Sequence, residues 1–176
     1  MDKLFFSDKL ISEFKKIANS KSPVLICGES GVGKEVVAKY IHSQSQYSKN
    51  NEIVINISSI PDDLIEKELF GSVEGAFTGA NKSSKGKLEL GHGSTIILDD
   101  IDKLNYNIQG KLLQFIEKGI VERVGESNTI HIDTRIIAIT TNSLFDLVNQ
   151  GKFRKDLFYR INVLNLSNKT IVSSVS

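Results

Sequence analysis

Residues 24–35 read VLICGESGVGKE, and this stretch decides the fold. Its first four residues are apolar, as in a strand buried on both faces of a parallel sheet. Glycines follow at positions 28, 31 and 33, and Lys34 comes just before residues with helical periodicity. The pattern G-x-x-x-x-G-K between a strand and a helix is typical of a loop that wraps phosphate groups. The sequence therefore predicts a phosphate-binding loop over residues 28–35, and the alternative is a glycine-rich turn without a ligand.

The chemistry of this loop rests on its backbone and one lysine. Successive N–H groups of such a loop point at phosphate oxygens, and the amino end of the following helix adds favourable partial charge. We expect Lys34 to reach the terminal phosphates of a nucleoside triphosphate. Position 35 holds Glu35, where many such loops place Ser or Thr against Mg²⁺. The loop residues predicted to bind the nucleotide are Gly28, Glu29, Ser30, Gly31, Val32, Gly33, Lys34 and Glu35.

Two acids follow the apolar run 95–98, which predicts another buried strand. Because the carboxyl ends of parallel strands meet at one edge of a sheet, Asp99 and Asp100 should lie beside the phosphate loop. We expect Asp99 to hold Mg²⁺, directly or through water. We expect Asp100 to orient and deprotonate the water that attacks the γ-phosphate. Alternatively, both acids merely end the strand.

Strands and helices alternate along the rest of the chain. The predicted strands are 24–27, 53–57, 95–98, 135–141 and 162–166. A first helix is predicted to begin after Ser7, and further helices are predicted over 33–43, 61–70, about 108–116 and 143–149. Gly119 is expected to end the helix around 108–116. This order indicates the α/β fold of a P-loop NTPase, a parallel five-stranded sheet flanked by helices. We expect one domain over residues 1–166, interrupted by a long glycine-rich loop at 71–94, and an irregular or disordered tail over 167–176.

Composition narrows the class of protein. The chain has 176 residues, 40% of them hydrophobic, which is enough for one substantial core. Its 22 Lys and Arg nearly balance 21 Asp and Glu, so no general positive charge favours nucleic acid or an anionic membrane. Cys27 is the only cysteine, and the sequence has neither a signal-peptide pattern nor a membrane span. We therefore expect a cytoplasmic protein, and the wide separation of its three histidines argues against a zinc site.

Residues 75–80 read GAFTGA inside the glycine-rich loop. Together with GESGVGKE and the stretches ELFGSVEGAFTGA, KLLQFIEKGIVERVG and FRKDLFYRINV, this hexapeptide resembles the central AAA+ ATPase domain of sigma-54-dependent transcription activators. The resemblance runs from about residue 5 to residue 166. It implies ATP hydrolysis in a ring of subunits, with a hexamer as the expected assembly.

The resemblance also implies that the GAFTGA segment contacts the sigma-54 factor of RNA polymerase. Its glycines allow the loop to bend, while Phe77 offers an apolar anchor and Thr78 a polar one. The alternative is a flexible surface loop without a partner. The residues expected to contact sigma-54 are Gly75, Ala76, Phe77, Thr78, Gly79 and Ala80.

The resemblance also implies functional roles for four further residues. Asn56, at a predicted strand end, would hydrogen-bond the neighbouring acid and relay the nucleotide state to GAFTGA, and Asn142 would sense the γ-phosphate. Arg154 and Arg160 would enter the site of the neighbouring subunit and stabilise the transition state. From the residues alone, Asn56 is a turn residue, Asn142 caps a helix, and both arginines are solvated.

The chain departs from the family at two places. Asp100 stands where most members have glutamate, which is longer by one methylene. After Leu166 the chain reads SNKTIVSSVS, whereas the family continues into a helical lid and usually a DNA-binding helix-turn-helix. We therefore expect a core without a lid or a DNA-binding domain. Two hypotheses remain. The first is an ATPase core that contacts sigma-54, and the second is a nucleotide-binding interaction module that does not hydrolyse ATP. An unrelated enzyme such as a kinase is less favoured, because it would need a second substrate pocket.

Overall fold

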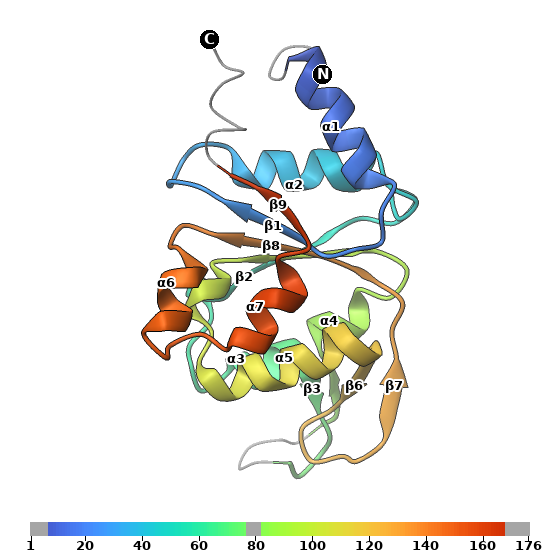
Figure 1. Cartoon of the computed structure of the whole chain (residues 1–176). Coiled ribbons are helices and arrows are strands. Elements are labelled where there is room, and N and C mark those ends of the chain that lie inside the picture. Colours follow the sequence, from blue (N-terminus) through green and yellow to red (C-terminus); the bar gives the residue numbers. More distant parts are fainter. Residues whose placement is uncertain (1–6, 77–81, 168–176) are drawn as a thin grey trace.

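The centre of the computed structural model, which describes residues 7–76 and 82–167, is a five-stranded parallel sheet (Figure 1). Its strands lie in the order β2-β5-β8-β1-β9, and every neighbouring pair is parallel. Their bounds are Val24–Cys27 for β1, Ile53–Asn56 for β2, Thr95–Asp99 for β5, Arg135–Thr140 for β8 and Leu164–Leu166 for β9. The predicted five-stranded parallel sheet is confirmed, although β2, β8 and β9 are shorter than expected and β5 extends to Asp99.

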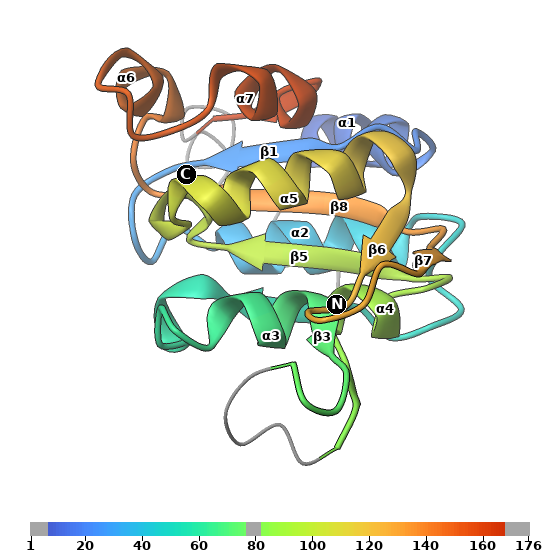
Figure 2. The ribbon, with the colours of Figure 1, turned by 90° about the horizontal axis from the view of Figure 1, so that it is seen from below.

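Helices cover both faces of this sheet (Figures 1 and 2). One face carries α1 (Asp8–Ala18) and α2 (Lys34–Ser43), and the other carries α3 (Ile65–Phe70), α4 (Lys87–Leu90), α5 (Tyr106–Lys118), α6 (Leu144–Asn149) and α7 (Lys155–Ile161). Successive residues of a strand point to opposite faces, so Val24 and Ile26 pack with α1 and α2 while Leu25 packs with the helices opposite. This explains why β1 is apolar throughout.

Local sequence signals set most of the helix ends. The side chains of Ser7, Asn105 and Ser143 cap α1, α5 and α6. Gly119 ends α5 in the left-handed conformation, with φ of 64°. In contrast, α3 begins at Ile65, later than predicted, because residues 62–64 form a turn closed by a hydrogen bond from Leu64 N–H to the Pro61 carbonyl. No helix in the described part of the chain has the length and apolar character that crossing a membrane requires.

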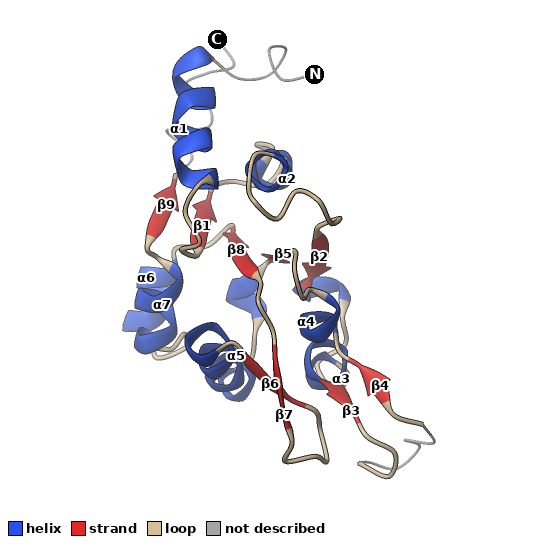
Figure 3. Ribbon diagram, turned by 90° about the vertical axis from the view of Figure 1, so that its right-hand side faces the viewer, coloured by secondary structure: helices blue, strands red, loops and turns tan. Residues whose placement is uncertain are grey.

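Two short antiparallel strand pairs, which the sequence pattern did not predict, project side by side from the molecule (Figure 3). They are β3 (Gly71–Ser72) with β4 (Ser84–Lys85), and β6 (Ile120–Glu122) with β7 (Thr129–His131). The N–H of Val73 donates to the carbonyl of Val124, and the N–H of Val124 donates to the carbonyl of Gly71, both at 3.0 Å. These bonds join the two pairs and fix the start of the segment that leads to GAFTGA.

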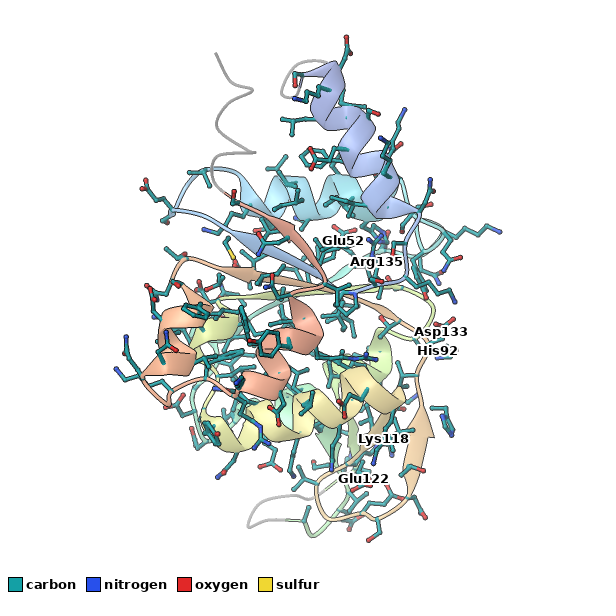
Figure 4. The ribbon with its side chains drawn as sticks, in the orientation of Figure 1. Glu52, His92, Lys118, Glu122, Asp133 and Arg135 are labelled. Atoms are coloured by element: carbon teal, nitrogen blue, oxygen red, sulfur yellow. The ribbon has the colours of Figure 1, made fainter. Side chains whose placement is uncertain are left out.

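Arg135, the first residue of β8, anchors α1 to the sheet (Figure 4). Its side chain is buried, and its guanidinium donates to the carbonyl oxygens of Ile17 at 2.6 Å and Ala18 at 3.0 Å. These carbonyls lie at the end of α1, and the carbonyl of Ile17 also accepts from the N–H of Ser20 at 3.1 Å, so Arg135 adds a charged donor to this helix end. Burial lowers the pKa of Arg135 to about 10, which leaves the side chain charged at neutral pH.

We expect Arg135→Met to lower the free energy of unfolding by roughly 2 to 4 kcal/mol, because two charge-assisted hydrogen bonds to buried carbonyls are lost. Urea unfolding followed by circular dichroism measures the change. Arg160→Met is the control, since Arg160 is exposed and makes one long contact, at 3.5 Å, with the carbonyl of Ile116. Equal losses in the two variants would show that Arg135 does not anchor α1.

Candidate functional site

The phosphate loop lies at the edge of the sheet where the carboxyl ends of β1, β5 and β8 meet. Cys27 is paired in register with Thr140, the last residue of β8, so the loop begins beside the end of β8. Gly31 and Gly33 have φ of +82° and +86°, a conformation that L side chains rarely adopt. No described atom lies within 4 Å of a Cβ built at either glycine. The backbone path therefore requires these glycines, and the space beside them is open to a ligand.

Lys34 is the polar centre of the loop. Its buried ammonium donates to the carbonyl oxygens of Gly28 at 2.6 Å and Glu29 at 2.9 Å, and to Oγ1 of Thr141 at 3.2 Å. These three neutral acceptors use the three N–H groups of the lysine. The side chain thus ties the loop to the residue that follows β8, and a phosphate oxygen would offer it a charged acceptor in place of a neutral one.

Asp99, the last residue of β5, lies beside this loop. Burial raises the pKa of the Asp99 carboxyl, and the charge of Asp100 raises it further, while the N–H of Asp100 and the ammonium of Lys34 oppose the shift. A carboxylate whose charge is disfavoured in this way gains from a nearby cation.

The residues present fit a magnesium ion that is shared with phosphate. Mg²⁺ usually keeps several waters and takes one or two carboxylates together with substrate phosphates. Among the described residues, no group of three or more His, Cys, Asp or Glu could hold a metal ion by itself. Asp99 would therefore be the protein ligand, and phosphate and water would supply the remaining oxygens. Glu35 instead forms an ion pair with Lys39 at 2.7 Å on the exposed side of α2.

Asp100 adopts the left-handed conformation, with φ of 57° and ψ of 43°, and is the only non-glycine residue with positive φ in residues 7–76 and 82–167. Such a conformation is strained by roughly 1 kcal/mol or more for a residue other than glycine. The hydroxyl of Ser58 donates a hydrogen bond to the Asp100 carboxylate. This contact holds the carboxylate against η2 (Ile57–Ser59), the short 3₁₀ helix that follows β2.

Asn56 lies beside Asp99 in the register of β2 and β5. The side chain of Asn56 makes no hydrogen bond to Asp99 or Asp100, in contrast to the bond to the neighbouring acid that the resemblance implies. The side-chain oxygen of Asn56 instead accepts from the N–H of Ser59 at 3.2 Å and caps η2. Ser58, which the sequence did not single out, takes the place expected for Asn56, and the relay role of Asn56 stays a prediction.

Asn142 follows β8 and does not cap α6, because Ser143 does so. Its amide Nδ2 donates to Oδ2 of Asp102 at 2.7 Å. The side chain of Asp102 is 1% exposed, and its Oδ1 accepts a hydrogen bond from the hydroxyl of Thr140 at 3.0 Å. Sequence reasoning missed Asp102, although a third acid in LDDID, residues 98–102, could have drawn attention to it.

An open pocket of 560 Å³ extends along this edge of the sheet. Burial raises the pKa of the Cys27 thiol, and the charge of Lys34 only partly opposes this shift, so Cys27 lines the pocket with an uncharged side chain. The pocket gives a nucleotide room beyond its phosphates. The residues that line it are Cys27, Gly28, Glu29, Thr141, Asn142, Ser143 and Ser167.

Neither Arg154 nor Arg160 makes a hydrogen bond to the phosphate loop, Asp99 or Asp100 of its own chain. The guanidinium of Arg154 makes two hydrogen bonds to Asp156, at 2.8 and 3.1 Å, and lies 5.3 Å from the ring centre of Tyr106. Arg160 lines a different pocket, of 390 Å³, which also includes Pro23 just before β1. The structure therefore brings together the phosphate loop, Asp99, Asp100, Asn56 and Asn142, but neither arginine.

Only the first two residues of GAFTGA belong to the described part of the chain. Phe77, Thr78, Gly79 and Ala80 lie outside it. A Cβ built on Gly125 would come within 2.6 Å of the Cβ of Ala76. The turn after β6 thus packs closely against Ala76, next to Gly75, and supports this end of the segment.

We expect Asp99→Asn to raise the free energy of unfolding at pH 7. The folded-state pKa of Asp99 lies above the unfolded value, so the folded protein binds this proton more tightly, and stability falls as the pH rises through the folded pKa. The gain from the variant should shrink as the pH falls through the folded-state pKa and be nearly absent below about 3.9, the pKa of an unperturbed aspartate. Urea unfolding at pH 7 and at about pH 3 measures both values.

Glu13→Gln is the control for this pH dependence, because Glu13 lies on the exposed side of α1. We expect it to change stability little at either pH. A loss of stability for Asp99→Asn at pH 7, or a gain that does not depend on pH, would contradict the assignment of a charge penalty to Asp99.

Comparison with known proteins identifies the family of the chain. Residues 6–167 match the family model described as the Sigma-54 interaction domain. The chain is 47% identical over 155 residues to the phenol regulator MopR of Acinetobacter guillouiae, covering 88% of this chain and 28% of MopR. It is 44% identical over 156 residues to the Nif-specific regulatory protein of Rhodobacter capsulatus, covering 89% of this chain and 27% of that protein. The chain thus spans less than a third of the length of these two relatives.

Solved structures agree with the predicted fold class. NtrX from Brucella abortus in complex with ATP has a TM-score of 0.83 and 32% identity, covering 91% of this chain and 34% of NtrX. The P-loop NTPase domain of a sigma-54 transport activator from E. coli has a TM-score of 0.61 and 15% identity, over 91% of this chain and 92% of that domain, which shows a likeness of fold alone. From the family match and the identity to these regulators, the chain belongs to the sigma-54 interaction domain family, as a P-loop NTPase of α/β fold.

Proposed function

We propose that this chain is the ATP-binding core of a sigma-54-dependent transcription regulator and that it hydrolyses ATP when it assembles with further copies. The observation that carries the proposal is the position of Lys34, which is held by three neutral acceptors at an open sheet edge. Asp99 and Asn142 lie at the same edge. Support for ATP as the ligand comes from NtrX, which was solved in complex with ATP.

In this proposal, different residues of the site bind the phosphates, hold the metal ion and activate the attacking water. The N–H groups of residues 29–34 and the ammonium of Lys34 bind the phosphates. Asp99 holds Mg²⁺, which when bound offsets the charge of the phosphates. Asp100, oriented by the hydroxyl of Ser58, accepts a proton from the attacking water, and Asn142 contacts the γ-phosphate.

Arg154 and Arg160 act on the site of a neighbouring copy. Both lie away from the phosphate loop of their own chain, and Asp156, the partner of Arg154, is itself exposed. An exposed ion pair contributes little, so Arg154 can exchange Asp156 for the transferring phosphate of a neighbour. A ring, with six subunits by family resemblance, is the assembly that would place the arginines in this way.

The GAFTGA residues 75–80 contact sigma-54 in this proposal. The family that the chain matches is described by its interaction with sigma-54. The two strand pairs hold the described start of the segment through the hydrogen bonds between Val73, Val124 and Gly71. A relay of the nucleotide state from Asn56 to this segment would pass through η2 and α3, which lie between them in the chain.

A second candidate function is a nucleotide-binding interaction module that does not hydrolyse ATP. The observation that favours it is Asp100, whose side chain is one methylene shorter than glutamate and is hydrogen-bonded to Ser58 in a strained backbone conformation. Misplacing a catalytic group by about 1 Å can slow a reaction by about a hundredfold. Binding assays and turnover assays separate the two functions.

Lys34→Ala should weaken the binding of Mg·ATP by at least about tenfold, because the charge-assisted contact with the phosphates is lost. Isothermal titration calorimetry measures the affinity. Lys39→Ala is the matched control, since Lys39 is an exposed lysine of the same helix whose ammonium pairs with Glu35. Similar affinities of the wild type and Lys34→Ala would refute the assignment of this loop as the ATP site.

ATPase activity per chain should rise with protein concentration if the arginines act in a neighbouring site. Arg154→Ala should abolish turnover, and mixing it with Lys34→Ala should restore part of the activity. In the mixture, an intact Arg154 from one variant meets an intact phosphate loop from the other. Activity strictly proportional to concentration, or no restoration on mixing, would exclude this arrangement. ATP binding without turnover at any concentration would favour the interaction module.

A further inference from the structure

Asp102, in the short helix η3 (Ile101–Lys103) that follows β5, is a buried acid beside the candidate site. Each of its oxygens has a donor within the protein. Oδ1 accepts from the Thr140 hydroxyl at 3.0 Å, and Oδ2 accepts from the Asn142 amide at 2.7 Å. The ammonium of Lys103 lies 3.3 Å from Oδ2 and balances the charge. A buried carboxylate with this full set of partners is held in one orientation.

The contact with Asp102 also fixes the orientation of Asn142. An ionised carboxylate can only accept hydrogen bonds, so the amide must present its NH₂ group to Asp102 and not its oxygen. One N–H is then bound to Asp102, which leaves the second N–H and Oδ1 for a ligand. Asn142 is exposed and lines the pocket of 560 Å³ together with Gly28 and Glu29 of the phosphate loop.

The residues around Asn142 are held from two sides. Thr140 and Asn142 are bound to Asp102, and Thr141, between them, accepts from the ammonium of Lys34 at 3.2 Å. The end of β8 therefore links the phosphate loop to η3. A rotation of the Asn142 amide would break the hydrogen bond to Asp102 and leave a buried carboxylate oxygen without this donor.

We propose that Asp102 is a positioning residue that fixes the amide of Asn142 and thereby sets the preference of the site for a nucleoside triphosphate over a diphosphate. The inference rests on the proposed function, in which Asn142 contacts the γ-phosphate. A diphosphate has no group at that position, so the orientation of Asn142 affects the triphosphate alone. Asp102 itself does not touch the nucleotide.

Asp102→Leu tests the proposal with a side chain that branches at the same carbon. It removes both carboxylate oxygens, so the acceptor for the Asn142 amide is lost. Calorimetry with Mg²⁺ and either ADP or a non-hydrolysable ATP analogue gives two dissociation constants. We expect the ratio of the ADP constant to the analogue constant to fall by about fivefold or more, with ADP affinity nearly unchanged.

Thr140→Val is the matched control. It removes the Thr140 hydroxyl, which lies within hydrogen-bond distance of Asp102 and of the backbone carbonyl of Asn142, and it leaves the bond between the side chains of Asp102 and Asn142. We expect this variant to change the ratio by less than about twofold. An unchanged ratio in Asp102→Leu, or an equal fall in Thr140→Val, overturns the proposal. If the wild-type chain binds neither nucleotide, the proposed function fails and this inference fails with it.

A second measurement uses the wild-type chain and does not depend on the folding of a variant. Hydrogen exchange of side-chain amides, followed by NMR, should show one Asn142 proton exchanging about tenfold more slowly than those of the exposed Asn149, because it is hydrogen-bonded to Asp102. The Asn142 signal is assigned by its loss in Asn142→Asp. Equal exchange rates at the two residues would show that Asp102 does not hold the amide and would overturn the proposal.

Discussion

The ammonium of Lys34 ties the phosphate loop to the end of β8, and the arrangement of the candidate site depends on this contact. It donates to two carbonyls within the loop and to Thr141, which follows the neighbouring strand. Because β1 and β8 are adjacent in the sheet, one side chain fixes the loop relative to Asn142. All three acceptors are neutral, so the cation is placed to bind an anion at an open edge. In the proposed function, a triphosphate accompanied by magnesium would satisfy Lys34 and Asp99 together.

Three acids within four residues have different surroundings, and this difference separates their proposed roles. Burial and a neighbouring charge disfavour the ionised form of Asp99, so it gains from a cation. Asp100 is strained and held by a hydroxyl, which orients its carboxylate. Asp102 is fully partnered and buried, so it can orient a neighbour but cannot easily bind a ligand. One strand end thus provides a candidate metal ligand, a candidate base and a proposed positioning residue.

The sheet, the phosphate loop and the position of Asp99 could be predicted because local signals encode them. Apolar runs define the buried strands, and glycine spacing defines the loop. The strands β3 and β4 have two residues each, too few to show the alternation that identifies a strand. The bonds of Asp100 to Ser58 and of Asn142 to Asp102 join residues 42 and 40 positions apart. They depend on the order of β2, β5 and β8, which no local pattern specifies.

Hydrogen–deuterium exchange of backbone amides, with and without Mg·ATP, tests most directly whether this sheet edge holds the nucleotide. The account predicts slower exchange at residues 29–34 and at the ends of β5 and β8, with no change in β6 and β7. The N–H groups of the loop should show the largest effect, since they face the phosphates. Protection confined to the pocket of Arg160 and Pro23, or no protection at residues 29–34 under saturating ATP, would contradict the account.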